Sequence, residues 1–150
     1  MSVPALIAAV LVAGCGGGSS GSSGSSSADF VADGNQICKE DNAKFRALEK
    51  SGSPADVRDF LDKLVPLLDE DLARLKGLTP PSDKADVYDA WISDLEQTTE
   101  SAHKAQGASS SDAATAMLKG NLAIDKQADA KAKELGLDEC LTGSGSGSSG

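Results

Sequence analysis

The sequence predicts an all-α fold, an up-down-up-down four-helix bundle closed by one disulfide. From residue 28 onward, apolar residues recur at intervals of three and four, which is the spacing of one helix face. Short stretches of Gly, Ser and Pro divide this pattern into four segments, joined by loops that suit antiparallel neighbours. Two cysteines, Cys38 and Cys140, lie near the two ends of the patterned region.

The first expected helix covers residues 28–50 and ends at "SGSP", where Gly52 and Pro54 break the pattern. Asp41 falls on its apolar side. Its carboxylate is either a satisfied polar group facing the core or a helix-edge group facing water, and we expect the second. The apolar side consists of Phe30, Val31, Ile37, Cys38, Phe45 and Leu48.

The second expected helix covers residues 54–76 and contains Pro66. Proline removes one backbone hydrogen bond, so we expect a kink or a division into two helices there. The stretch "GLTPPSD" follows, and Ser82 or Asp83 can cap the next helix. The apolar stripe consists of Val57, Phe60, Leu61, Leu64, Leu68, Leu72 and Leu75.

The third expected helix covers residues 82–106, and its aromatic pair allows two interpretations. Tyr88 and Trp91 could form an exposed binding face, but such residues more often form the bulky core of a small bundle. We therefore expect them in the core. The apolar stripe consists of Val87, Tyr88, Trp91, Ile92 and Leu95.

The fourth expected helix covers residues 110–135 and begins at "SSSD". Gly136 is well placed to end it as a left-handed residue, with Leu137 making the apolar contact that follows such an ending. Asn121 falls on the apolar stripe, and we expect it, like Asp41, at an edge that faces water. The stripe consists of Ala114, Met117, Leu118, Asn121, Ile124, Ala128, Ala132 and Leu135.

The two cysteines of the bundle are expected to pair. In an up-down-up-down bundle the first helix begins at the pole where the fourth ends, so Cys38 and Cys140 belong to the same pole. A bridge between them would close a loop of about a hundred residues. By lowering the entropy of the unfolded chain, it would stabilise the fold by at most about 4–5 kcal/mol. Two free buried thiols or metal ligation are the alternatives; zinc is disfavoured because the chain has no Cys-x-x-Cys pair and one histidine.

The charge balance narrows the classes of partner. The chain has 23 acidic and 14 basic residues, a net charge of −9. Such a surface repels phosphate backbones and anionic lipids, which argues against a nucleic-acid partner. Acidic and basic residues alternate along the expected helices, as on an ordinary solvated surface, and we expect a monomer.

The N-terminal region predicts that the protein is targeted to a membrane. Residues 3–13 form an apolar run that is too short for a bilayer span of about 20 residues but suits a signal peptide. The residues that follow this run, Val12, Ala13, Gly14 and Cys15, resemble the lipobox of bacterial lipoproteins. That resemblance implies cleavage before Cys15 and fatty acylation of Cys15, which anchors the protein to the extracytoplasmic face of the cell membrane. A simple secretory peptide is the alternative.

The domain organisation follows from these segments. We expect a signal peptide at 1–14, a lipidated cysteine with a Gly/Ser tether at 15–27, one bundle domain at 28–141 and a disordered Gly/Ser tail at 142–150. The domain also resembles small helical lipoproteins of actinobacterial type, through "FVADGNQIC", "TPPSD", the Tyr88–Trp91 pair and "LGLDEC". That resemblance implies a disulfide-closed helical bundle and no particular activity.

Little in the sequence points to catalysis. His103, the single histidine, could bind haem together with Met117, or a metal through the Glu100-x-x-His103 spacing, but each signal is weak. We therefore expect no catalytic residue, metal or cofactor. The predicted function is a non-enzymatic binding or structural module of the cell envelope, with an envelope protein as a candidate partner; the alternative is a haem or metal redox protein that uses His103.

Overall fold

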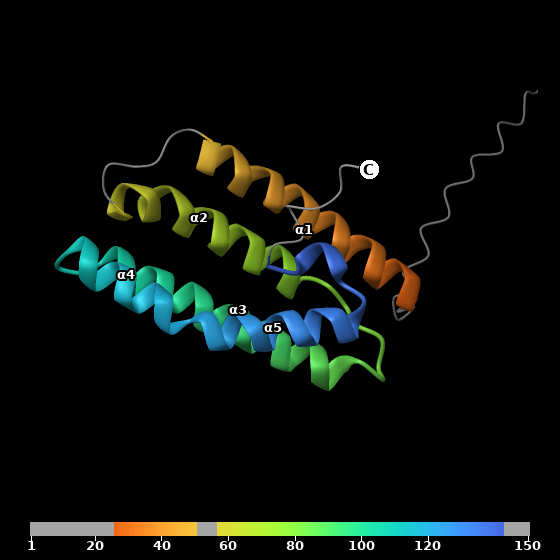
Figure 1. The fold of residues 1–150 in the computed structure, drawn as a ribbon. Helices are drawn as coiled ribbons and strands as arrows, with labels where there is room; N and C mark the ends of the chain where they lie inside the picture. Colours follow the sequence, from red (N-terminus) through yellow and green to blue (C-terminus); the bar gives the residue numbers. More distant parts are fainter. Residues whose placement is uncertain (1–25, 51–56, 143–150) are drawn as a thin grey trace, which may run out of the picture.

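The computed structural model describes residues 26–50 and 57–142, and their regular structure is entirely helical (Figure 1). This confirms the predicted all-α class. The elements are α1 (Ser27–Lys50), α2 (Val57–Lys76), α3 (Ala85–Gln106), α4 (Ser111–Gly120), α5 (Leu122–Leu135) and the short 3-10 helix η1 (Asp138–Cys140).

The predicted fourth helix is divided into α4 and α5, which meet at Asn121. The Asn121 amide donates to the Leu118 carbonyl at 3.1 Å, a bond across three residues that tightens the turn. Gly120 immediately precedes this turn, and glycine is among the poorest helix formers. Asn121 is only 7% exposed, so its expected position at a water-facing edge was wrong.

The helix ends agree with the sequence at some positions and differ at others. Ser110 caps α4 and accepts a bond from the Ala113 amide, and it lies in "SSSD", the predicted start of this helix. The N-cap of α3 is Lys84, which makes no side-chain cap, so capping by Ser82 or Asp83 was wrong. At the start of α1, the Ser26 hydroxyl accepts from the Asp29 amide at 3.2 Å. The last residues of the expected tether therefore belong to the fold.

Pro66 lies within α2 without ending it, so α2 is not divided into two helices. The side chain of Pro66 is exposed, on the side of α2 that faces water. A carbonyl group left without its amide partner on that side can bond to water, which lowers the cost of proline inside a helix.

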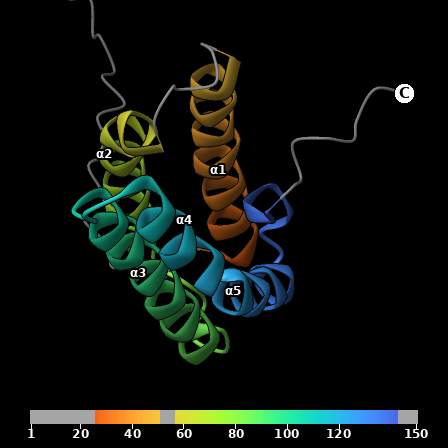
Figure 2. The ribbon, with the colours of Figure 1, turned by 60° about the vertical axis from the view of Figure 1, so that its left-hand side comes forward.

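The packing centres on α3, which contacts α2, α4 and α5, whereas α1 contacts α2 and η1. Figure 2 shows η1 beside α1, next to the end of α5. The buried residues form two clusters. The larger one contains Phe30, Cys38, Leu75, Tyr88, Trp91, Ile92, Ala128, Ala132, Leu135 and Leu137; the smaller one contains Leu61, Ala105, Ala108 and Ala114.

The aromatic pair of α3 lies in the larger cluster. Tyr88 and Trp91 are 5% and 1% exposed, so they do not form an exposed face and the core interpretation is confirmed. The Tyr88 ring meets the Phe30 ring edge to face at 5.7 Å and lies 6.1 Å from the Trp91 ring. The Tyr88 hydroxyl donates to the Leu75 carbonyl, which gives this buried polar group a partner.

None of the helices among the described residues combines the length and the hydropathy that a bilayer span requires.

Candidate functional site

A pocket of about 210 Å³ lies where α1, α2, α3, α5 and the C-terminal segment meet. Four helices supply its walls, and residues 140–142 lie along one side. Most of the lining is apolar, with a smaller polar part that includes four aspartates. The apolar side chains are Phe45, Leu68, Trp91, Leu95, Ala128 and Leu141.

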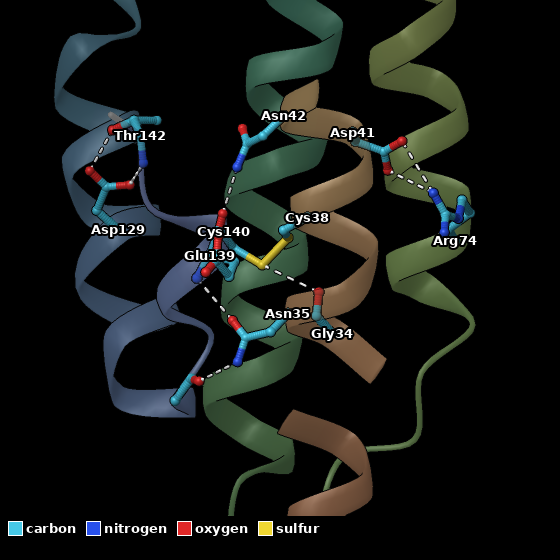
Figure 3. The surroundings of a disulfide bond; sticks show 11 residues. Gly34, Asn35, Cys38, Asp41, Asn42, Arg74, Asp129, Glu139, Cys140 and Thr142 are labelled. Carbon is cyan, nitrogen blue, oxygen red and sulfur yellow. Dashed lines mark hydrogen bonds and ion pairs between the residues drawn. A yellow bond between two sulfur atoms is a disulfide. The ribbon is translucent and has the colours of Figure 1, made fainter. Parts of the chain in front are cut away.

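The C-terminal segment is fastened to α1 by a disulfide. Cys38 and Cys140 form this bond with their Cα atoms 5.0 Å apart, as predicted, and both residues line the pocket (Figure 3). The bond joins positions 102 residues apart in the sequence. It therefore fixes one wall of the pocket to another.

Two asparagines of α1 flank the disulfide and bind the backbone of the same segment (Figure 3). The Asn35 amide donates to the Gly136 carbonyl at 3.0 Å and accepts from the Glu139 amide at 2.9 Å. Asn42 donates to the Glu139 carbonyl at 2.7 Å. Asn35, Cys38 and Asn42 are spaced by three and four residues, so they share one face of α1. Our sequence interpretation missed this role, although the spacing was a visible signal.

The close approach of the segment to α1 depends on two glycines. A Cβ atom at Gly34 would lie 2.5 Å from the Leu137 Cδ2 atom, and Leu137 is fully buried. Gly136 has φ +80°, the left-handed conformation predicted for it. The Leu137 amide donates to the Ala132 carbonyl and the Gly136 amide to the Lys133 carbonyl, the bond pair of a Schellman ending.

Thr142 continues the pocket wall beyond the expected end of the domain. Its amide donates to Asp129 Oδ1 at 2.8 Å and its hydroxyl to Asp129 Oδ2 at 2.5 Å, which fastens the segment to α5 as well (Figure 3). The predicted boundary at residue 141 was therefore one residue early. The rest of the expected tail, 143–150, lies outside the described residues.

Asp41 is buried, contrary to expectation. It is 2% exposed, and both of its carboxylate oxygens lie 3.1 Å from Arg74 Nη1 (Figure 3). Lys44 Nζ lies 2.8 Å from Asp41 Oδ1. These partners offset the cost of burying the charge, so the carboxylate can occupy the apolar side of α1.

Asp71 lines the same pocket, and its carboxyl group has fewer polar partners than that of Asp41. Its Oδ1 atom is buried and is the one side-chain atom in the described part of the chain that is buried without a hydrogen-bond partner. Burial, together with the neighbouring Asp41 carboxyl group, raises the pKa of Asp71 to about 7. Such a carboxyl group is partly protonated near neutrality.

Two further carboxyl groups come from α5. Asp125 Oδ1 accepts a bond from the Thr98 hydroxyl at 3.1 Å, and burial raises the pKa of Asp125. Asp129 accepts the two bonds from Thr142. Within the described residues no Lys or Arg forms an ion pair with Asp71, Asp125 or Asp129, in contrast to Asp41.

The residues of the redox alternative lie outside the pocket. His103 is exposed, and its Nε2 lies 2.9 Å from Asp69 Oδ1 on α2. Glu100 pairs with Lys104, and Met117, expected in the core, is 44% exposed. Residues 26–50 and 57–142 contain no group of three or more His, Cys, Asp or Glu side chains arranged to hold a metal ion.

The predicted lipidation site, Cys15, and its lipobox lie outside the described residues.

A comparison with protein-family models finds no match, and searches among curated proteins and solved structures find none either. We therefore infer function from the residues of the pocket.

Proposed function

We propose that the protein is a non-enzymatic binding module, held on the extracytoplasmic face of the membrane by lipid on Cys15, with the pocket as its binding site. The observation that carries the proposal is an apolar pocket of about 210 Å³ with a small number of polar groups in its wall. Small-molecule sites have this composition. An apolar cavity of about 150 Å³ holds benzene, so this pocket has room for one ring and a short chain.

The cysteines support the proposed location on the extracytoplasmic face of the membrane. The chain has three, and Cys38 is bonded to Cys140, which leaves Cys15 for another role. Disulfides persist mainly in oxidising, extracytoplasmic compartments. Acyl chains contribute about 0.8 kcal/mol per buried methylene, and two or more of them give stable anchoring without a membrane-spanning helix.

The proposed topology is the up-down-up-down bundle, with α4 and α5 together as its fourth member. The bond between Cys38, in the middle of α1, and Cys140, just after α5, supports it, because it joins the first and the last member of the bundle. The contacts of α1 with α2, of α2 with α3 and of α3 with both α4 and α5 agree with this arrangement.

Ligand binding can be tested with the protein's own fluorescence. Trp91 is the single tryptophan of the chain and lines the pocket, so its emission reports on that site alone. We expect titration of the full chain with 2-phenylethanol, a neutral apolar probe, to change the emission in a saturable way. The variant Ala128→Leu, which places a larger side chain in the pocket, should abolish the change.

The matched control is Ala130→Leu, an identical substitution at an exposed position of α5 outside the pocket. It should bind like the parent chain, and circular dichroism checks that both variants are folded. No saturable response to any apolar probe in the parent chain would refute the pocket as a binding site.

The membrane address is tested separately with Cys15→Ala. We expect this variant to leave the membrane fraction when cells are fractionated, whereas Ser19→Ala in the expected tether should stay with it. A membrane-associated Cys15→Ala protein would refute the anchor and leave the pocket proposal unaffected.

A further inference from the structure

We propose that the pocket binds a small organic ammonium ion, with its apolar body against Trp91 and Leu95 and its charged group at Asp71. This inference rests on the proposed function, since it names the class of ligand for the same site. It is carried by an unsatisfied carboxyl oxygen, by the commitment of the neighbouring cations to other groups, and by the apolar walls.

The first observation is the Asp71 oxygen. Oδ1 is shielded from solvent and has no hydrogen-bond partner, although Asp71 lines the pocket. A buried acceptor without a donor destabilises a protein by about 1–3 kcal/mol, so native structures keep few of them. Rotation of the Asp71 carboxyl group would bring this oxygen to the pocket, where a ligand that donates N–H groups would remove that cost, and an ammonium group offers up to three.

The second observation is that the nearby cations are already engaged. Lys44 Nζ lies 2.8 Å from both Asp41 and Glu70, and Arg74 contacts Asp41 together with Glu40. These contacts hold both cations at other carboxylates, so although Arg74 and Lys44 act on Asp71 electrostatically, neither forms an ion pair with it. A carboxyl group of the pocket therefore lacks a paired cation, and a positively charged ligand can supply one.

The two carboxyl groups that α5 contributes to the pocket also favour a positively charged ligand. Asp125 and Asp129 accept bonds from Thr98 and Thr142, which are neutral donors. Burial raises the pKa of Asp71 and of Asp125, so the site opposes negative charge on both carboxyl groups. An ammonium ion would relieve this opposition, whereas a carboxylate or phosphate ligand would increase it.

The third observation distinguishes an organic cation from a bare metal ion. The walls beside the carboxyl groups are the side chains of Trp91, Leu95 and Leu68. Hard cations prefer six or more oxygen ligands, which such walls do not supply. A ligand with an apolar body buries this surface, and the burial adds affinity.

Three probes with one apolar body and different charges test the inference. We would titrate the full chain at pH 8 with 2-phenylethylamine, 2-phenylethanol and 3-phenylpropanoate, and follow Trp91 emission. The amine should bind at least about tenfold more tightly than the alcohol, as expected for a hydrogen bond to a charged group. The carboxylate should bind more weakly than the alcohol.

The variant Asp71→Asn should reduce the preference for amine over alcohol at least about fivefold. Its matched control is Asp69→Asn, which makes the same change of charge on the same helix at an exposed position outside the pocket. That control should keep the full preference.

The outcomes separate the two proposals. Equal affinity for amine and alcohol in the parent chain would overturn the ammonium inference while the binding pocket stands, and tighter binding of the carboxylate would do the same. Failure of all three probes to alter Trp91 emission would remove the binding pocket itself. The comparison in the parent chain needs no variant, so it decides the question even if Asp71→Asn does not fold.

Discussion

The two buried clusters of this protein are built in different ways. The larger cluster contains three aromatic side chains and the disulfide, and it lies against η1 and the end of α5. The smaller cluster, where α2 and α3 meet α4, has one large side chain, Leu61, among three alanines. Alanines let helix backbones approach closely, but each buries little apolar area. The comparison indicates that rigidity is concentrated at the end of the molecule that carries the pocket.

The covalent and polar contacts follow the same distribution. The disulfide, the Asn35 and Asn42 bonds and the Schellman ending of α5 all hold the wall of the pocket. At the other end, Ser110 caps α4 and Arg58 reaches the Ala108 carbonyl at 3.5 Å. A binding site needs walls that are held in place before the ligand arrives, and the well-fastened end meets that need.

The largest effect is expected from Trp91→Ala, which empties the centre of the larger cluster. Truncating a buried aromatic side chain costs about 3–5 kcal/mol of unfolding free energy. Urea unfolding followed by circular dichroism measures it. A loss below about 1 kcal/mol would contradict the assignment of Trp91 to the core.

Leu61→Ala should come next, at about 2–4 kcal/mol, because Leu61 is fully buried and is the one large side chain of its cluster. Hydrogen exchange should show faster opening of α4 and of the first turns of α2, with the disulfide end still protected. If protection is lost equally throughout the chain, the two clusters are one cooperative unit and the contrast between them fails.

Asp71→Asn is expected to stabilise the protein at neutral and higher pH by about 2 kcal/mol. The raised pKa means that between about pH 4 and pH 7 the unfolded chain has lost a proton that the folded chain keeps. The unfolding free energy of the parent chain therefore falls as pH rises through this window. The Asn side chain carries no such proton, so its advantage is absent at pH 4, grows up to pH 7 and is constant above.

Besides burial, the groups that set this titration come from two elements: Asp41 and Lys44 on α1 and Arg74 on α2. Urea unfolding at pH 4, 6 and 8 measures the difference. Asp59→Asn, the same substitution at an exposed position of α2, is the control. A constant difference between Asp71→Asn and the parent at all three pH values would contradict the shift.

Asn35→Ala should cost about 1–2 kcal/mol, because it removes the two hydrogen bonds that the Gly136 carbonyl and the Glu139 amide make with Asn35. Gln36→Ala, at the exposed neighbouring position, should change stability by less than about 0.5 kcal/mol. Thermal unfolding with the disulfide intact measures both. Equal effects would show that the Asn35 bonds do not hold the segment.

The smallest effects concern the C-terminus. Removal of residues 143–150 should leave the melting temperature unchanged, whereas removal of 142–150 should lower it slightly, since Thr142 makes two bonds to Asp129. The expected difference is about 0.5–1.5 kcal/mol, the usual worth of such bonds. Identical melting curves for the two truncations would show that the folded domain ends at residue 141.

The sequence by itself determined the features that depend on neighbours along the chain. Helices follow from apolar spacing, the end of α5 from Gly136, and the start of α4 from "SSSD", because each rests on residues within one or two turns. The pairing of Cys38 with Cys140 was also predicted from the sequence, because these two cysteines lie near the two ends of the patterned region.

Only the tertiary structure decided whether the polar residues on the apolar stripes are buried and which partners they have. Asp41 is buried because Arg74, 33 residues later, meets it, and Asn35 finds its partners 101 and 104 residues away. The pocket likewise exists because four helices and the C-terminal segment meet around small and polar side chains. Periodicity reports which side of a helix is apolar, but the partner that makes a buried charge tolerable comes from a distant part of the chain.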